Sequence, residues 1–257
     1  MTRELEPTHI IATLDRLRKR IEERFPGAGL GRLAADLLAL ARESAAASAA
    51  LARPYWAIRI GVGAVVALGL GVLALAARSL RMPRGLESLA ELLQVIESGI
   101  NDAVFLTLAI LFLLSLEQRI KRRRALALIH RLRSIAHIVD MHQLTKDPDR
   151  LRADRIATAS SPTPSLGIED LGHYLDYCSE LLSLTSKVAT LLGERRSDPV
   201  VLAAINEVEL LATGLSTKIW QKLTILDAAR RAAAAAPPAP DGGPLTARSS
   251  AARTLRP

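Results

Sequence analysis

The stretch IGVGAVVALGLGVLALAA, from Ile60 to Ala77, decides the fold class of this chain. It contains no charged or polar side chain, and as an α-helix it would extend about 27 Å, close to the thickness of the hydrocarbon core of a bilayer. Tyr55 and Trp56 stand just before it, where an interfacial aromatic belt is expected. We therefore predict a membrane-spanning helix over residues 54–78. The alternative is a buried helix of a soluble core, which rarely lacks polar residues over such a length.

A second apolar run, AVFLTLAILFLLSL, extends from Ala103 to Leu116. As a helix it covers only about 21 Å, so we extend it backwards through Asn101 and Asp102. A carboxylate near an interface costs much less than one at the bilayer centre. The sequence thus predicts a second span over residues 100–118, with residues 79–99 as an external connection. Within that connection, residues 86–99 are amphipathic, so they either lie on the membrane surface or extend the second helix.

The orientation follows from the distribution of cations. Residues 119–155 hold 11 basic and 4 acidic side chains, whereas Arg78 and the connection that follows it together hold three Arg and three Glu. Because Lys and Arg remain on the cytoplasmic side, we expect both termini in the cytoplasm. Arginine provides 28 of the 34 cations, and with abundant Ala this is typical of a GC-rich bacterial genome. We expect a multi-pass protein of the bacterial inner membrane, with the first span as an uncleaved anchor.

Basic residues cluster directly after the second span. We expect this cluster to fix the topology and to contact anionic lipid headgroups, so membrane lipids are predicted partners. We do not expect a nucleic acid as partner, because aromatic residues are not interleaved with the cations and no recognisable module surrounds them. The headgroup-contacting residues are Arg119, Lys121, Arg122, Arg123 and Arg124.

The remaining segments predict helices. Residues 1–53 contain two helical stripes separated by FPGAGLG (25–31), which reads as a helix-to-helix turn. Residues 119–231 predict a helical bundle, and residues 232–257 a disordered tail. Asp198 followed by Pro199 predicts the start of a helix.

Two stripes with heptad spacing predict an antiparallel hairpin, as in coiled coils. The stripes consist of Ile168, Leu171, Leu175, Cys178, Leu182, Thr185, Ala189 and Leu192, and of Val201, Ile205, Val208, Ala212, Leu215 and Ile219. The predicted fold class is all-α, a two-helix transmembrane hairpin with a cytoplasmic antiparallel helical bundle.

Candidate chemical sites are few. His137 and Asp140 form a His-x-x-Asp pair, as do His173 and Asp176, and this spacing places both members of a pair on one helical face. Two such helices packed together would place four ligands around a divalent metal, although polar residues at the bundle surface explain the same pattern. We expect no cofactor and identify no catalytic residue. Cys178, the single cysteine, is expected to be buried in the core.

A ridge of small residues runs along the first span. Gly63, Ala67 and Gly71 recur at four-residue spacing, which lets a neighbouring helix approach closely. The neighbour is either the second span of the same chain or the first span of another copy.

Several segments resemble a family of uncharacterised bacterial two-span membrane proteins. They are RFPGAGL (24–30), ARPYWAIRIGVG (52–63), IAHIVDMHQLTKDP (135–148), YLDYCSELLSLTSK (174–187) and LSTKIWQKL (215–223). The resemblance implies the architecture and supplies no activity. We expect a non-enzymatic membrane scaffold or interaction protein that self-associates or recruits a membrane protein partner. The alternatives are a small pore-forming effector, with Glu97, Asn101 and Asp102 at its outer mouth, and a metal-dependent membrane enzyme that uses the His-x-x-Asp pairs.

Overall fold

The computed structural model describes residues 5–80, 89–148, 166–193 and 198–235. These residues form helices and no strand, so the all-α prediction is confirmed for them. The helices are α1 (Pro7–Arg24), α2 (Gly29–Ala52), α3 (Trp56–Leu80), α4 (Leu89–Leu144), α5 (Ile168–Thr190) and α6 (Pro199–Ala235).

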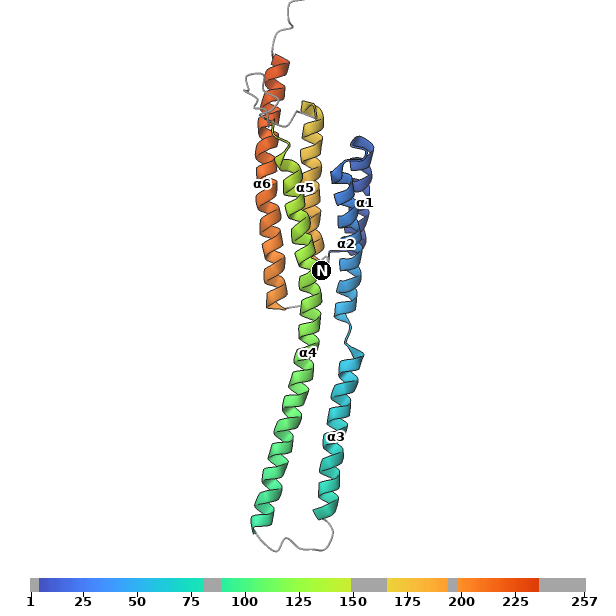
Figure 1. The fold of residues 1–257 in the computed structure, drawn as a ribbon, viewed down its shortest axis with the longest axis vertical. Helices are drawn as coiled ribbons and strands as arrows, with labels where there is room; N and C mark the ends of the chain where they lie inside the picture. The colour runs from blue at the N-terminus through green and yellow to red at the C-terminus, as the bar shows by residue number, and fades with distance from the viewer. Residues whose placement is uncertain (1–4, 81–88, 149–165, 194–197, 236–257) are drawn as a thin grey trace, which may run out of the picture.

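A helical bundle forms one end of the molecule (Figure 1). Helix α5 packs against α1, α2, α4 and α6, so it lies in the middle of the bundle. All members of the two predicted heptad stripes are buried except Ile168, which is half-buried. Neither stripe could be covered by its own helix, and their mutual burial is the main source of the α5–α6 contact.

Two predicted helix boundaries are confirmed. Helix α6 begins at Pro199, and the Asp198 carboxylate accepts hydrogen bonds from the backbone N–H groups of Val200 (3.0 Å) and Val201 (3.3 Å). Between α1 and α2 the chain turns at Gly27, which has φ +70°, a conformation that glycine adopts without steric cost. The predicted turn is confirmed over residues 25–28, whereas the last three residues of the FPGAGLG segment, from Gly29, already belong to α2.

Helices α3 and α4 extend beyond the bundle as an antiparallel pair (Figure 1). With 56 residues, α4 is about 84 Å long, and only its C-terminal part belongs to the bundle. Of the two alternatives for the predicted connection 79–99, the described part continues the second helix, because α4 already begins at Leu89. Residues 81–88 lie outside the described residues. So do residues 236–257 of the predicted tail, whereas residues 232–235 belong to α6.

Large apolar side chains are exposed all along the protruding pair. Leu68 and Leu75 on α3 and Phe105 and Phe112 on α4 are each about two-thirds exposed or more. Three helical segments are long and apolar enough to cross a membrane by length and composition: Gly29–Val72, Ile96–Leu144 and Pro199–Arg231. The most apolar windows of the first two are unburied, whereas 28% of the third is buried. The sequence analysis predicted two spans. By length and composition, the segment Pro199–Arg231 is a third candidate.

Glycine residues mark where α3 meets α4. A Cβ atom added at Gly69 would come within 2.9 Å of Cδ2 of Leu106, and one added at Gly61 would lie 4.0 Å from Cδ1 of Leu113. These two positions share one face of α3, two turns apart. The two contacts show that α3 and α4 run antiparallel. They also fix which residues of the two helices lie at the same level.

Candidate functional site

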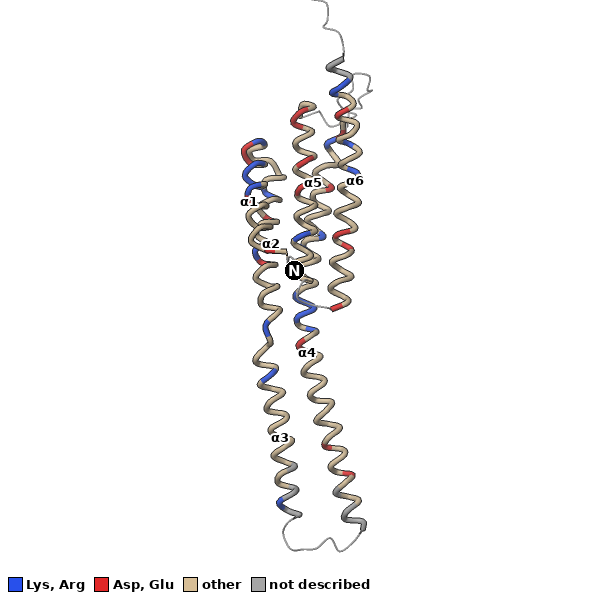
Figure 2. The backbone as a smooth tube through the Cα atoms, turned by 180° about the vertical axis from the view of Figure 1, so that it is seen from behind, with Lys and Arg blue, Asp and Glu red and all other residues tan. Residues whose placement is uncertain are grey.

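The junction between the bundle and the protruding pair carries a group of cations on α4 and on the chain that joins α2 to α3 (Figure 2). We call this group the collar and define it by its cations Arg53, Arg59, Arg119, Lys121, Arg122, Arg123 and Arg124. It also brings together two stretches far apart in the sequence. The chain between α2 and α3 lies against α4 here, since the backbone N–H of Tyr55 donates to Oε1 of Glu117 (3.4 Å).

Two cations of the collar have partners inside the molecule. Lys121 is buried, forms an ion pair with Glu117 (2.6 Å) and places its ammonium 5.5 Å from the ring centroid of Tyr55. Arg122 forms an ion pair with Asp198 (2.9 Å), the residue that caps α6. These two side chains therefore hold the α2–α3 connection and the start of α6 against α4. Their contact with lipid headgroups, which the sequence suggests, stays a prediction.

Asp198 illustrates the local electrostatics. Its side chain is 12% exposed, and burial alone would raise its pKa. The hydrogen bond from Arg122 and those from the backbone of Val201 and Val200 outweigh burial and lower its pKa. The carboxylate is thus stabilised in its charged form by the groups that it positions.

The other cations of the collar point outward. Arg53, Arg59, Arg119, Arg123 and Arg124 are exposed, and none of them forms an ion pair with a residue that the structure describes. Trp56, between Arg53 and Arg59 in the chain, is 71% exposed. The collar therefore combines two neutralised cations with five exposed arginines and one exposed aromatic side chain.

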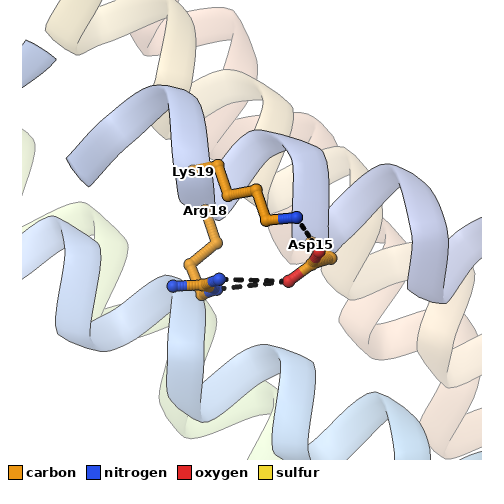
Figure 3. Close-up of polar contacts among 3 residues, drawn as sticks. All are labelled: Asp15, Arg18 and Lys19. Atoms are coloured by element: carbon orange, nitrogen blue, oxygen red, sulfur yellow. Dashed lines mark hydrogen bonds and ion pairs between the residues drawn. The ribbon is translucent and has the colours of Figure 1, made fainter. Parts of the chain in front are cut away.

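The cations of α1 differ from those of the collar. Figure 3 shows Asp15 accepting hydrogen bonds from Nε (3.3 Å) and Nη2 (3.2 Å) of Arg18 and pairing with Lys19 (3.0 Å). Farther along α1, Arg20 pairs with Glu180 (3.0 Å) and Arg24 with Asp170 (3.4 Å), both on α5. The basic face of α1 is thus largely neutralised by neighbouring carboxylates.

The four predicted metal ligands are not brought together. His137 and Asp176 are exposed, because the neighbouring residues Ala136 and Cys178 take the buried positions of their helices. The other member of each pair, Asp140 or His173, is half-buried, so each pair lies at the edge of the core. Asp140 instead accepts a hydrogen bond from Gln143 (2.6 Å). Among the described residues, no group of three or more His, Cys, Asp or Glu side chains is placed to hold a metal ion.

A different histidine lies at an interhelical contact. Nδ1 of His142, on α4, is 3.3 Å from the Tyr174 hydroxyl on α5. Burial lowers the pKa of His142, and the nearby cations Lys146 and Arg32 lower it further. Burial also raises the pKa of Tyr174. This contact joins the distal ends of α4 and α5, and residue spacing within either helix could not reveal it.

The predicted ridge of small residues faces outward. Gly63, Ala67 and Gly71 are exposed, and a Cβ atom added at Gly63 or Gly71 would meet nothing within 4 Å. The contact with α4 uses Gly61 and Gly69 instead, on the opposite face of α3. Within one chain, therefore, the ridge has no described helix against it.

Comparisons of this chain with models of protein families, with curated proteins and with solved structures found no match.

Proposed function

We propose that this chain is a non-enzymatic integral protein of the bacterial inner membrane, which crosses the bilayer twice and serves as a self-associating scaffold or interaction protein. The observation that carries this proposal is the protruding pair of α3 and α4, which exposes many large apolar side chains along its length. Soluble monomers rarely expose continuous apolar surface of that extent, and lipid is the solvent that fits it. The resemblance to bacterial two-span proteins agrees with this interpretation and stays a prediction.

Two spans are favoured over three because of how α6 is used. Its apolar residues Val201, Ile205 and Ile219 are buried against other helices of the bundle. It also pairs Glu207 with Arg133 of α4 (3.1 Å), and this arginine would enter the bilayer together with α6. Placing several charged side chains of neighbouring helices in hydrocarbon is costly. We therefore assign α6 to the cytoplasmic bundle, which leaves both termini on the cytoplasmic side.

Self-association is supported by the outward direction of the ridge. In lipid, helices associate by close packing of backbones rather than by a hydrophobic effect, and small residues permit that approach. The ridge of Gly63, Ala67 and Gly71 is open to a second copy, while Gly69 is already opposed by Leu106.

Crosslinking of the full chain in membranes tests this proposal. Replacing Gly71 with Ile adds a branched side chain at the closest approach, so we expect the crosslinked dimer to fall about tenfold. Gly69→Ile is the matched control, because it acts on the contact with Leu106 inside one chain. Equal dimer yields in the wild type and Gly71→Ile would refute association through the ridge.

A pore-forming effector is the second candidate, and one observation favours it. Asn101 and Asp102 are exposed on α4, and Asp102 precedes Leu106 by one turn on the side that faces α3. Polar side chains at membrane depth usually pair with each other or line a water-filled path. Ion flux through liposomes that contain the purified chain would support the pore, and tight liposomes at the same protein density would exclude it.

A further inference from the structure

We propose that Arg119 and Arg123 form a binding site for the phosphate groups of anionic phospholipids on the outer face of α4. The proposal rests on the proposed function, because it requires that α3 and α4 cross a bilayer. It adds the chemical class of the lipid and selects two residues from the seven cations of the collar.

The cations of the collar differ in whether the molecule itself neutralises them. Lys121 and Arg122 are neutralised by Glu117 and Asp198, so their charges are directed into the molecule. Arg119 and Arg123 are exposed and have no ion pair with any described residue. The sequence between Glu117 and Asp140 contains no acidic residue that could neutralise them locally.

The positions of Arg119 and Arg123 on α4 suit a phosphate group. Arg119 and Arg123 are four residues apart on one helix, so their side chains leave the same face one turn apart. Two guanidinium groups at that spacing present parallel N–H donors that match the oxygens of a phosphate. Arg119 follows Leu116, the last residue of the apolar run, by about 4.5 Å along the helix. This height corresponds to the headgroup layer if the apolar run occupies the hydrocarbon core.

Two other arginines on the same helix differ from Arg119 and Arg123 because they have carboxylate partners. Arg131 and Arg133 are also exposed, but Arg131 pairs with Glu43 (2.6 Å) and Arg133 with Glu207 (3.1 Å). They lie about 12 Å or more beyond Arg123 along α4, which exceeds the Debye length at physiological salt. They therefore provide a matched control with the same number of charges on the same element.

Quenching of tryptophan fluorescence by brominated lipids tests the site in the full chain. Replacing both native tryptophans with Phe and introducing Phe112→Trp leaves one reporter, seven residues before Arg119 and on the same face of α4. Phe112 is 65% exposed, so bromine on the acyl chains of a bound lipid can reach this position. The probes are brominated phosphatidylglycerol and brominated phosphatidylcholine, each titrated over the same range of mole fractions into phosphatidylcholine vesicles.

We expect brominated phosphatidylglycerol to quench at a mole fraction about fivefold lower than brominated phosphatidylcholine. Arg119→Gln with Arg123→Gln should abolish that preference, and Arg131→Gln with Arg133→Gln should retain it. Equal quenching by the two lipids in the parent, or equal loss of preference in both double variants, would overturn the proposed site. Absence of quenching by either lipid would instead show that α4 does not enter the bilayer, and the proposed function would fail with it.

Discussion

At the scale of single residues, the partners of the charged side chains decide their roles. The sequence predicts one cluster of five cations after the second span, but Lys121 and Arg122 turn inward while their neighbours stay exposed. Asp198 is 76 positions away from Arg122 in the chain. No local pattern reports an ion pair of that separation, so the partner of Arg122 could not be predicted from spacing. The partner of Lys121 could have been, because Glu117 precedes it by four residues on one helix.

Asp198 offers a test of this division. Asp198→Ala removes the cap of α6 and the partner of Arg122, and we expect a loss of about 1–3 kcal/mol in the free energy of unfolding at neutral pH. Asp198→Asn should retain the cap, since Asn is an equally good N-cap residue, and lose only the ionic part. The measurement is thermal unfolding in detergent, followed by circular dichroism. Identical stability of the Ala variant and the wild type would contradict the assigned role.

The same residue predicts a dependence on pH. The pKa of Asp198 is lower in the folded state than its ordinary value near 3.9, so its contribution to stability is complete above that value. The contribution is lost as the pH falls through the lowered folded pKa. Between neutral pH and pH 3, the wild type should therefore lose more stability than Asp198→Asn does.

Cys178 tests the packing around a single buried group. Burial raises the pKa of its thiol to about 12, so roughly one thiol in ten thousand is ionised at pH 8. We expect no reaction with a maleimide reagent in the native protein and complete reaction after denaturation. A cysteine introduced by Ser183→Cys, at an exposed position of the same helix, should react at once. Rapid labelling of native Cys178 would mean that α5 is not packed as described.

At the scale of helices, the apolar pattern was sufficient to predict α5 and α6. A heptad stripe needs a complementary surface, and positions such as Leu175 and Val208 are buried as the spacing predicts. The His-x-x-Asp pairs had the same kind of spacing, but spacing gives the shared face and not its direction. Each pair has one exposed and one half-buried member, because the core positions next to them are taken by other residues.

The contribution of this packing can be measured with two leucines. Leu182 is fully buried on α5, and Leu182→Ala should cost about 2–5 kcal/mol. Leu210, on α6, is 65% exposed, so Leu210→Ala should change the free energy of unfolding by less than about 0.5 kcal/mol. Unfolding of both variants in detergent provides the comparison, and equal effects would show that the buried face has been assigned wrongly.

At the scale of the whole molecule, the sequence predicted the two apolar helices but did not predict which residues of α3 contact α4. Four-residue spacing singled out Gly63, Ala67 and Gly71, whereas the contact uses Gly61 and Gly69. Small residues occur on both faces of α3, so composition cannot tell which face meets the neighbouring helix. The position of the collar along the two helices depends on how α3 and α4 are paired, and that pairing exists only when both helices are assembled.

The central claim is that α3 and the first part of α4 cross the membrane as a hairpin and leave the bundle in the cytoplasm. Reporter fusions at residue 85 and at the C-terminus test it most directly, with one reporter active only outside the cytoplasm and one active only inside. We predict an external signal at residue 85 and a cytoplasmic signal at the C-terminus. An external C-terminus would contradict the claim: with an external signal at residue 85 it would make α6 a third span, and with a cytoplasmic signal there it would invert the hairpin.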